Sequence, residues 1–231
     1  YKNNNGTWTQ LGDDIDGEAA DDQSGRSVSL SADGSIVAIG AYKNDGKGSN
    51  SGHVRVLQFN TTTSSWDQLG IDIDGESAVD ESGFSVSLSD DGSVVAIGAY
   101  GNDGSGTDSG HVRVFQFNNN NWDQLGDDID GEADGDYFGR PVRLSADGQI
   151  MAIGAIFNDG NGTDSGHVRV FQYNNNNWTQ LGSDIDGEAL LNWSGSSVSL
   201  SADGSVVAIG AIYNDGKGSN SGHVRVLQFN T

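Results

Sequence analysis

The chain has 231 residues, of which 34% are hydrophobic, and it contains 35 glycines, one proline and no cysteine. This composition predicts short strands joined by many tight turns, and it excludes a disulfide framework or a thiolate metal site. The formal net charge of −22 argues against nucleic acid and acidic membrane surfaces as partners, and no apolar run is long enough for membrane insertion.

A stretch of about 57 residues occurs four times, in copies 8–65, 66–121, 122–177 and 178–231. In every copy a valine follows the first tryptophan by 20 residues, and a histidine follows that valine by 25 residues. Only the distance from the histidine to the next tryptophan varies, between 13 and 11 residues. Length variation at one connection indicates an exposed hairpin loop in an otherwise packed repeat. We therefore expect residues 1–231 to form a single repeat domain.

Each copy contains four strand candidates, which in the first copy are residues 8–12, 27–31, 36–41 and 53–59. The second candidate alternates between apolar and polar residues, whereas the third is apolar or small on both faces and is expected to be covered from both sides. An Asp-Gly pair between them predicts a tight hairpin. No segment has a helical period, so helices should be nearly absent.

Four-stranded antiparallel units that are covered on both faces are the blades of a β-propeller. We predict an all-β, propeller-type array of four such blades. The chain starts with a strand that completes a blade and stops one strand short, and residues 44–61 and 214–231 are identical. The strand near Trp8 is therefore expected to pair with the last blade, either closing the array in cis or, by strand exchange, completing another molecule in a filament. A third alternative is that these residues are one period of a longer array.

The third copy carries Phe138, Gly139 and Val142, then Ala-Ile-Gly-Ala at 152–155 and Gly-His-Val-Arg-Val-Phe at 166–171. These motifs resemble the FG-GAP repeat family, whose blades form the propeller of integrin α-subunits and occur in many secreted microbial and algal proteins. The resemblance covers all four copies and implies an extracellular or cell-surface location. Serine replaces the phenylalanine in the other copies, at Ser24, Ser82 and Ser194. The calcium loop of integrin-type blades is shortened here to Ser-Ala-Asp-Gly-Ser or Ser-Asp-Asp-Gly-Ser, so that site does not carry over.

Two acidic elements recur and are the places where Ca²⁺ could bind. Calcium takes six to eight oxygen ligands, which closely spaced carboxylates could supply in part. In the first element, Asp-x-Asp-Gly-Glu, the middle residue is always isoleucine, which favours a structural turn. The second element, Asn-Asp-Gly, is a turn signature before it is a ligand set. The candidate ligands are Asp16, Asp74, Asp130 and Asp186 in the first element and Asp45, Asp103, Asp159 and Asp215 in the second.

Three residue types recur with the repeat and are expected to make structural contacts. A histidine precedes an arginine by two residues on the fourth strand of each copy, and we interpret the pair as a polar contact between blades, made with the Asp-Gly-Glu acids. The residues are Trp8, Trp66, Trp122 and Trp178; His53, His111, His167 and His223; and Arg55, Arg113, Arg169 and Arg225.

Few residues depart from the repeat, and these are Tyr137, Arg140, Pro141, Arg143 and Trp193. Catalysis requires an asymmetric assembly of nucleophile, base and orienting group, whereas nearly every polar residue here belongs to the repeat. We therefore expect no enzyme. Trp193 suits stacking on a sugar ring in a lectin, the alternative being ordinary packing.

Sequons for N-glycosylation occur at Asn5, Asn60, Asn161, Asn177 and Asn192. Those at Asn5, Asn60 and Asn177 lie in or before the variable hairpin, where a glycan is sterically allowed.

The function predicted from the sequence is that of an extracellular structural or adhesive repeat protein. It would present acidic, N-glycosylated loops and self-associate through strand exchange or repeat stacking. The alternative is a cation-dependent propeller module that binds extracellular glycans or proteins.

Overall fold

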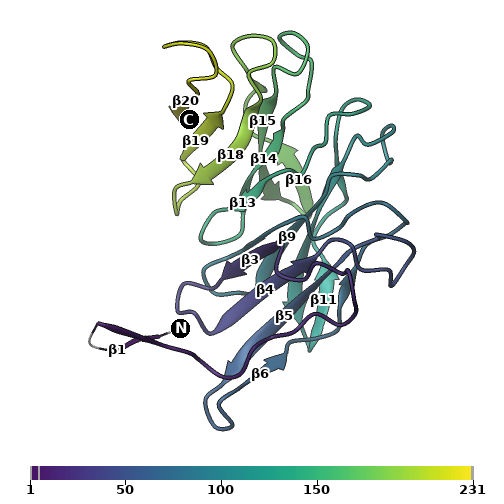
Figure 1. The fold of residues 1–231 in the computed structure, drawn as a ribbon, viewed down its shortest axis with the longest axis vertical. Helices are drawn as coiled ribbons and strands as arrows, with labels where there is room; N and C mark the ends of the chain where they lie inside the picture. Colours follow the sequence, from purple (N-terminus) through teal and green to yellow (C-terminus); the bar gives the residue numbers. More distant parts are fainter. Residues whose placement is uncertain (1, 5, 230–231) are drawn as a thin grey trace.

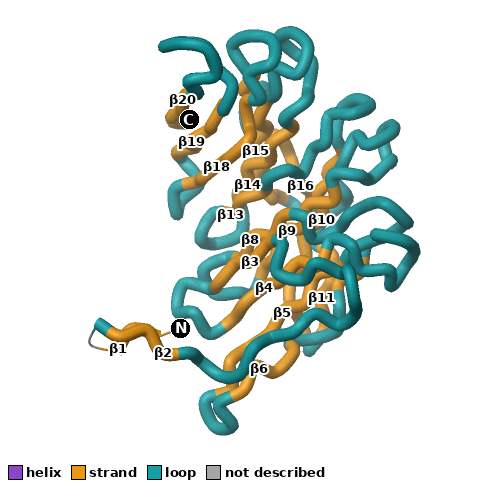
Figure 2. The backbone as a smooth tube through the Cα atoms, viewed as in Figure 1, coloured by secondary structure: helices purple, strands orange, loops and turns teal. Residues whose placement is uncertain are grey.

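A computed structural model describes residues 2–4 and 6–229 and shows an all-β array of successive small sheets (Figures 1 and 2). In the part of the chain that the structure describes, no helix has the length and apolar character that crossing a bilayer requires. The predicted all-β class is confirmed, and the array is open rather than closed into a ring.

Each blade is an antiparallel sheet in which the strands follow one another in chain order. The first blade contains β3 (Ser27–Leu30), β4 (Ile36–Ala41), β5 (His53–Asn60) and β6 (Ser65–Gln68), with β7 (Ile73–Asp74) also paired to β5. The second contains β8 (Ser85–Leu88), β9 (Val94–Ala99), β10 (His111–Asn118), β11 (Asn121–Gln124) and β12 (Ile129–Asp130). The third contains β13 (Val142–Leu144), β14 (Ile150–Ala155), β15 (His167–Asn174), β16 (Asn177–Gln180) and β17 (Ile185–Asp186). The last has β18 (Ser194–Leu200), β19 (Val206–Ala211) and β20 (His223–Gln228).

The tryptophan strand that begins each copy belongs to the blade of the preceding copy. Trp66, for example, lies on β6 and pairs with Phe59 of β5, although β8 to β10 of its own copy form the next blade. The second, third and fourth copies therefore each join two blades, and each of the first three blades is assembled from two copies.

The expected pairing of the Trp8 strand with the last blade is not observed within this chain. Trp8 is 67% exposed and lies on β2 (Thr7–Thr9), which forms a hairpin with β1 (Lys2–Asn4). Among the described strands, β20 pairs only with β19. The hairpin projects from one end of the array and the C-terminus lies towards the other (Figure 1). The blades fan out along an arc that does not close, and β2 and β20 are not paired with each other in this chain (Figure 1).

Hydrophobic cores lie between the blades rather than inside one common centre. Ile36 and Val54 of the first blade pack against Val86, Val95 and other residues of the second. Equivalent clusters join the second blade to the third and the third to the last. Each sheet therefore needs its neighbours to bury its two faces, as expected of a repeat array.

Close backbone contact between blades explains the two glycines of the repeat motif. A Cβ atom on Gly40, Gly98 or Gly154 would lie 2.0, 2.1 or 2.5 Å from the carbonyl oxygen of a glycine in the following blade. Ser27 and Ser85 donate hydrogen bonds to those same carbonyl oxygens, at 2.7 Å each. Only glycine permits this approach.

We predict that Gly98→Ala destabilises the protein by about 2–3 kcal/mol, because the new methyl group would push against the backbone of the next blade. Gly210→Ala is the matched control. Its Cβ would meet the Ser197 hydroxyl at 2.4 Å, much as that of Gly98 would meet the Ser85 hydroxyl at 2.5 Å. Unlike the Cβ of Gly98, it would not contact the backbone of a following blade. Urea unfolding measures both, and equal losses would contradict the explanation.

Candidate functional site

Two sets of residues have the chemistry to form a site: the polar residues that recur with the repeat, and the few that depart from it. The recurring histidine and arginine project from the third strand of each blade toward the Asp-x-Asp-Gly-Glu segment attached to the preceding blade. Arg113 of β10 donates to the Asp74 carbonyl oxygen at 2.6 Å and lies 3.5 Å from Glu76. The Nδ1 atom of His111 lies 3.9 Å from the other oxygen of Glu76. The interpretation of these residues as blade-to-blade contacts agrees with this geometry.

Burial sets the charge of these histidines. It lowers the pKa of His111 and of His167 to about 4, and the adjacent Arg113 and Arg169 act in the same direction. Both imidazoles are therefore neutral at pH 7, so their contact with glutamate is polar rather than ionic. Burial also raises the pKa of Glu132, against the influence of Arg169.

Three groups in the described residues bring a histidine and two carboxylates within 4.8 Å of one another. They are Glu18, His53 and Asp72; Glu76, His111 and Asp128; and Glu132, His167 and Asp184. Neutral imidazole and carboxylate are ligand types that suit a divalent cation. The guanidinium of Arg113 against Glu76, however, already supplies a positive charge there and opposes a second one.

The candidate calcium ligands of the Asn-Asp-Gly loops have backbone partners within their own loops. Asp45 accepts a hydrogen bond from the Asn50 amide at 2.8 Å, and Asp103 accepts one from the Asp108 amide at 2.8 Å. Asp159 and Asp215 accept the equivalent bonds. The carboxylates thereby hold the turn, and among the described residues none of them belongs to a group of three or more histidines and acids.

The candidates of the other element lie at blade edges. Asp74, Asp130 and Asp186 end the short strands β7, β12 and β17, and Asp16 holds the same repeat position without forming a strand. The carbonyl oxygens of all four accept hydrogen bonds from the repeat arginines. Of the isoleucines before them, Ile73 and Ile129 are buried, whereas Ile15 and Ile185 are half-buried. These aspartates are likewise outside the groups that combine histidine with acids.

The sequons differ in accessibility. Asn177 is exposed at the β15–β16 hairpin, Asn161 is exposed but donates to the Gly187 carbonyl oxygen, and Asn60 is half-buried. Asn192 is 5% exposed and accepts a hydrogen bond from Asn214, so a glycan on it is incompatible with the folded blade. Asn5 lies outside the described residues.

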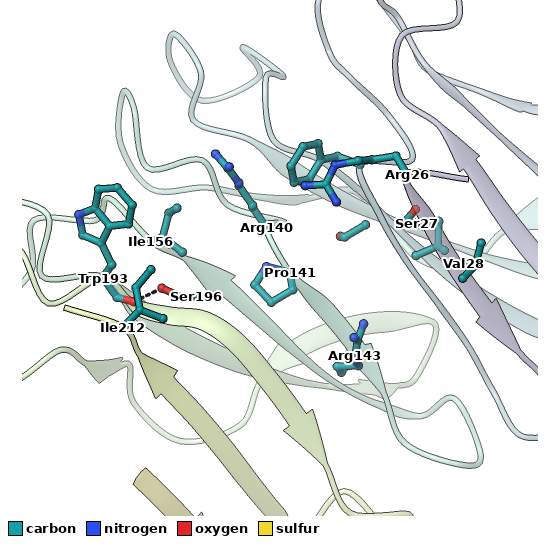
Figure 3. A pocket seen from close by; sticks show the side chains of 13 residues that line it. Arg26, Ser27, Val28, Arg140, Pro141, Arg143, Ile156, Trp193, Ser196 and Ile212 are labelled. Atoms are coloured by element: carbon teal, nitrogen blue, oxygen red, sulfur yellow. Dashed lines mark hydrogen bonds between the residues drawn. The ribbon is translucent and has the colours of Figure 1, made fainter. Parts of the chain in front are cut away.

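The residues that depart from the repeat gather on the inner side of the arc. A cavity of about 430 Å³ lies at the N-terminal ends of β3, β8 and β13 and beside β18. Arg140, Pro141, Arg143 and Trp193 line it, four of the five residues that the sequence singled out (Figure 3). We refer to it as the arginine groove.

Sequence reasoning missed two further residues of the groove, Arg26 and Phe84. They hold the same repeat position, two residues before the valine of the first inner strand, where the later copies have Arg140 and Ser196. Aligning that one position across the copies is the signal that would have found them. The guanidinium of Arg26 lies 4.0 Å from the Phe84 ring centroid, and that of Arg140 lies 4.9 Å from it.

An aromatic row continues from the groove across all four blades. Its rings meet edge to face, with neighbouring centroids 4.5 to 5.4 Å apart. The members, in contact order, are Tyr42, Phe84, Tyr100, Tyr137, Phe157, Trp193 and Tyr213. Burial and a hydrogen bond to Glu81 raise the pKa of Tyr100 well above its usual range. The row fixes the orientation of Trp193 at the edge of the groove.

Successive four-stranded sheets that pack face to face define a β-propeller-type blade array, and solved structures support this. A Bacteroides uniformis protein assigned as a 6-phosphogluconolactonase aligns with a TM-score of 0.57 and 13% identity over 88% of this chain and 50% of that one. Hydrazine synthase of Kuenenia stuttgartiensis aligns with a TM-score of 0.53 and 13% identity over 88% of this chain and 46% of that one. A Bacteroides fragilis protein, also assigned as a 6-phosphogluconolactonase, aligns with a TM-score of 0.54 and 11% identity over 87% of this chain and 49% of that one. The chain thus spans about half the length of these proteins, and such low identity shows the fold alone.

Residues 15–57 and 129–171 match the FG-GAP repeat. These two segments are FG-GAP repeats, and the second and fourth copies have the same spacing of tryptophan, valine and histidine. A comparison with curated proteins found no match.

The neutral, buried His167 predicts a pH-dependent stability. Its pKa is about 4 in the folded protein and 6.5 in an unfolded chain, so the unfolded state binds the proton first as pH falls. Relative to His167→Gln, the natural protein should lose about 2–3 kcal/mol of unfolding free energy between pH 6.5 and pH 4. Carboxyl groups with a raised pKa increase the unfolding free energy as pH falls. They do so in both proteins, so their contribution cancels when the two pH profiles are subtracted. Urea unfolding at several pH values measures this, and parallel curves would sink the prediction.

Proposed function

We propose that this chain is a non-enzymatic, extracellular structural or adhesive repeat protein that presents acidic, glycosylated loops and self-associates end to end. The observation that carries the proposal is a recurring site between neighbouring blades that accepts a tryptophan indole, which we call the tryptophan seat. Three such seats are filled within the chain, and the one at the last blade is open. The FG-GAP repeats support the extracellular location, and the exposed Asn177 supports glycosylation.

The filled seats share one geometry. Trp66, Trp122 and Trp178 donate from Nε1 to the carbonyl oxygens of Leu11, Leu69 and Leu125, at 2.8, 2.8 and 2.7 Å. An aromatic residue of the adjacent strand packs against each indole, with ring centroids 5.1 to 5.3 Å apart. The glycine after each leucine leaves room for the indole.

The fourth seat is a cavity of about 190 Å³ lined by Leu181, Gly182 and Phe229 among others. In the described residues no tryptophan reaches it, whereas Trp8 is 67% exposed on the projecting β2. Leu11, three residues after Trp8, already occupies its repeat position against Trp66. These observations support the proposal that β2 of one molecule pairs with β20 of another and inserts Trp8.

The outer faces of the end blades complement each other as well. Val224 and Val226 of β20 are 67% and 68% exposed, whereas Val54 and Val56, their counterparts in the first blade, are 0% and 1% exposed. At the other end Val28 is 64% exposed, against 2% for its counterpart Val86. Each end therefore presents the surface that packs against the other end in the interior of the array. Such a head-to-tail contact produces an open filament when the rotation does not close.

Two complementary variants test this assembly. Trp8→Ala removes the donor tryptophan, and Val226→Asp places a charge on the acceptor face, so each variant alone should be monomeric at concentrations where the unaltered chain forms large species. An equimolar mixture should form a dimer, because the Val226→Asp chain keeps an intact donor strand and the Trp8→Ala chain keeps an intact acceptor face. The dimer cannot grow, since both intact parts are used in it. Analytical ultracentrifugation reads out the sizes.

The control for that experiment is Ile71→Ser, since Ile71 is 69% exposed but lies between β6 and β7, outside β2, β3 and β20. It should assemble like the unaltered chain. A chain of residues 1–231 that stays monomeric at high concentration would refute the assembly proposal.

A second candidate function is that of a cation-dependent module for glycans or proteins, in which the three groups of histidine and acids would hold the cation and the arginine groove would hold the ligand. It predicts that millimolar Ca²⁺ raises the melting temperature and that a chelator abolishes ligand binding. Differential scanning fluorimetry with and without chelator measures the first effect. Absence of both responses would remove the cation from the proposal.

A further inference from the structure

The arginine groove holds positive charge that the rest of the molecule does not neutralise. The chain has 33 acidic and 11 basic residues, yet within residues 2–4 and 6–229 the guanidinium groups of Arg26 and Arg140 form no ion pair and no hydrogen bond. Arg143 donates only to the carbonyl oxygen of Val142, at 2.9 Å. The arginines of the repeat, by contrast, are used structurally, as Arg113 is against Glu76. Unpaired guanidinium groups in an acidic protein indicate an anionic ligand.

Flat apolar surfaces lie beside these charges. Both Arg26 and Arg140 stack on the ring of Phe84, and Pro141 lies beside Arg140 in the middle of the residues that line the groove (Figure 3). Trp193 is half-buried and has a φ of 52°, a backbone conformation that is uncommon for a bulky residue. Ser196 donates to its carbonyl oxygen, and Phe157 and Tyr213 hold its ring from two sides. The indole is therefore positioned at the groove wall rather than free to turn.

We propose that the arginine groove binds a saccharide that carries a carboxylate group. The planar fork of an arginine matches a carboxylate with two parallel hydrogen bonds. Trp193 and Pro141 supply apolar surface for the nonpolar face of a pyranose ring. A volume of about 430 Å³ lies in the range of small-ligand pockets and suits one or two sugar units.

The net charge of −22 decides between this ligand and larger anions. A nucleic acid or a second copy of this acidic chain would be repelled over its whole length, whereas a short saccharide with one or two carboxylates meets mainly the local charge of the groove. The proposal depends on Arg26, Arg140 and Trp193, whereas end-to-end assembly depends on Trp8 and Val226. Either can therefore fail without the other.

Isothermal titration calorimetry with digalacturonate tests the assignment. The unaltered chain should bind it, and Arg26→Gln and Arg140→Gln should each weaken binding at least about tenfold, with Arg140→Lys intermediate because lysine keeps the charge but loses the fork. Trp193→Ala should weaken binding of digalacturonate. It should leave the much weaker binding of acetate unchanged, because acetate has no sugar ring to contact the indole. Lys217→Gln is the matched control, because it removes one positive charge outside the groove.

Four outcomes would overturn the proposal. The first is absence of binding by the unaltered, folded chain. The second is equal competition by acetate at the same carboxylate concentration, and the third is equal binding of the uncharged digalactose, since the groove would then recognise only one half of the ligand. The fourth is an equal loss of binding in Lys217→Gln and Arg140→Gln, which would indicate general electrostatics. Arg26 is exposed, so its variant should fold, and circular dichroism verifies this.

Discussion

The array depends on the approach of two glycine backbones between neighbouring blades. At Gly98 the Cα atom lies under the carbonyl oxygen of Gly139, so close that a Cβ atom would stand 2.1 Å from it. The Ser85 hydroxyl satisfies the same carbonyl oxygen at 2.7 Å. This contact sets the spacing of the inner strands, and the valine and isoleucine side chains beyond it can then interdigitate. The phenylalanine of the motif varies among the copies, whereas the two glycines are present in each, because it is the backbone contact that requires them.

Fixed spacing of the inner strands also explains where a binding site can form. In each copy one position directly follows the glycine of the motif, two residues before the valine of the first inner strand, and the four side chains at this position line the same cavity. Where that position is serine, as at Ser196, it adds little; where it is Arg26, Phe84 and Arg140, it produces charge stacked on an aromatic ring. The repeat thus supplies a rigid frame, and three substitutions are sufficient to give one place on it a distinct chemistry.

Much of the fold was predictable because the repeat aligns with itself. The strand predicted at 36–41 is β4, and the one predicted at 53–59 is β5 with one further residue. The two-residue strands β7, β12 and β17 were not predicted, since a pattern of period two cannot be recognised over two residues. Closure in cis was one of the alternatives that the sequence left open, because closure depends on the angle between blades and no local pattern encodes that angle. Arg26 and Phe84 were missed because each looks ordinary in its own copy and only their shared position brings them together.

The two identical segments, 44–61 and 214–231, show how far structure here is set by the neighbour. Val54 is fully buried and Val224 is 67% exposed, although the residues around them in sequence are the same. The side chain of His53 is 3% exposed and that of His223 is 25% exposed, each beside its glutamate. Since hydrophobic burial is the main favourable term in folding, the last blade receives less stabilisation than the first from an equal sequence. Covering the exposed valines of the last blade would therefore be favourable, and it requires a further strand or blade. In this molecule the exposed Trp8 strand has the sequence that fills the equivalent place in the other blades.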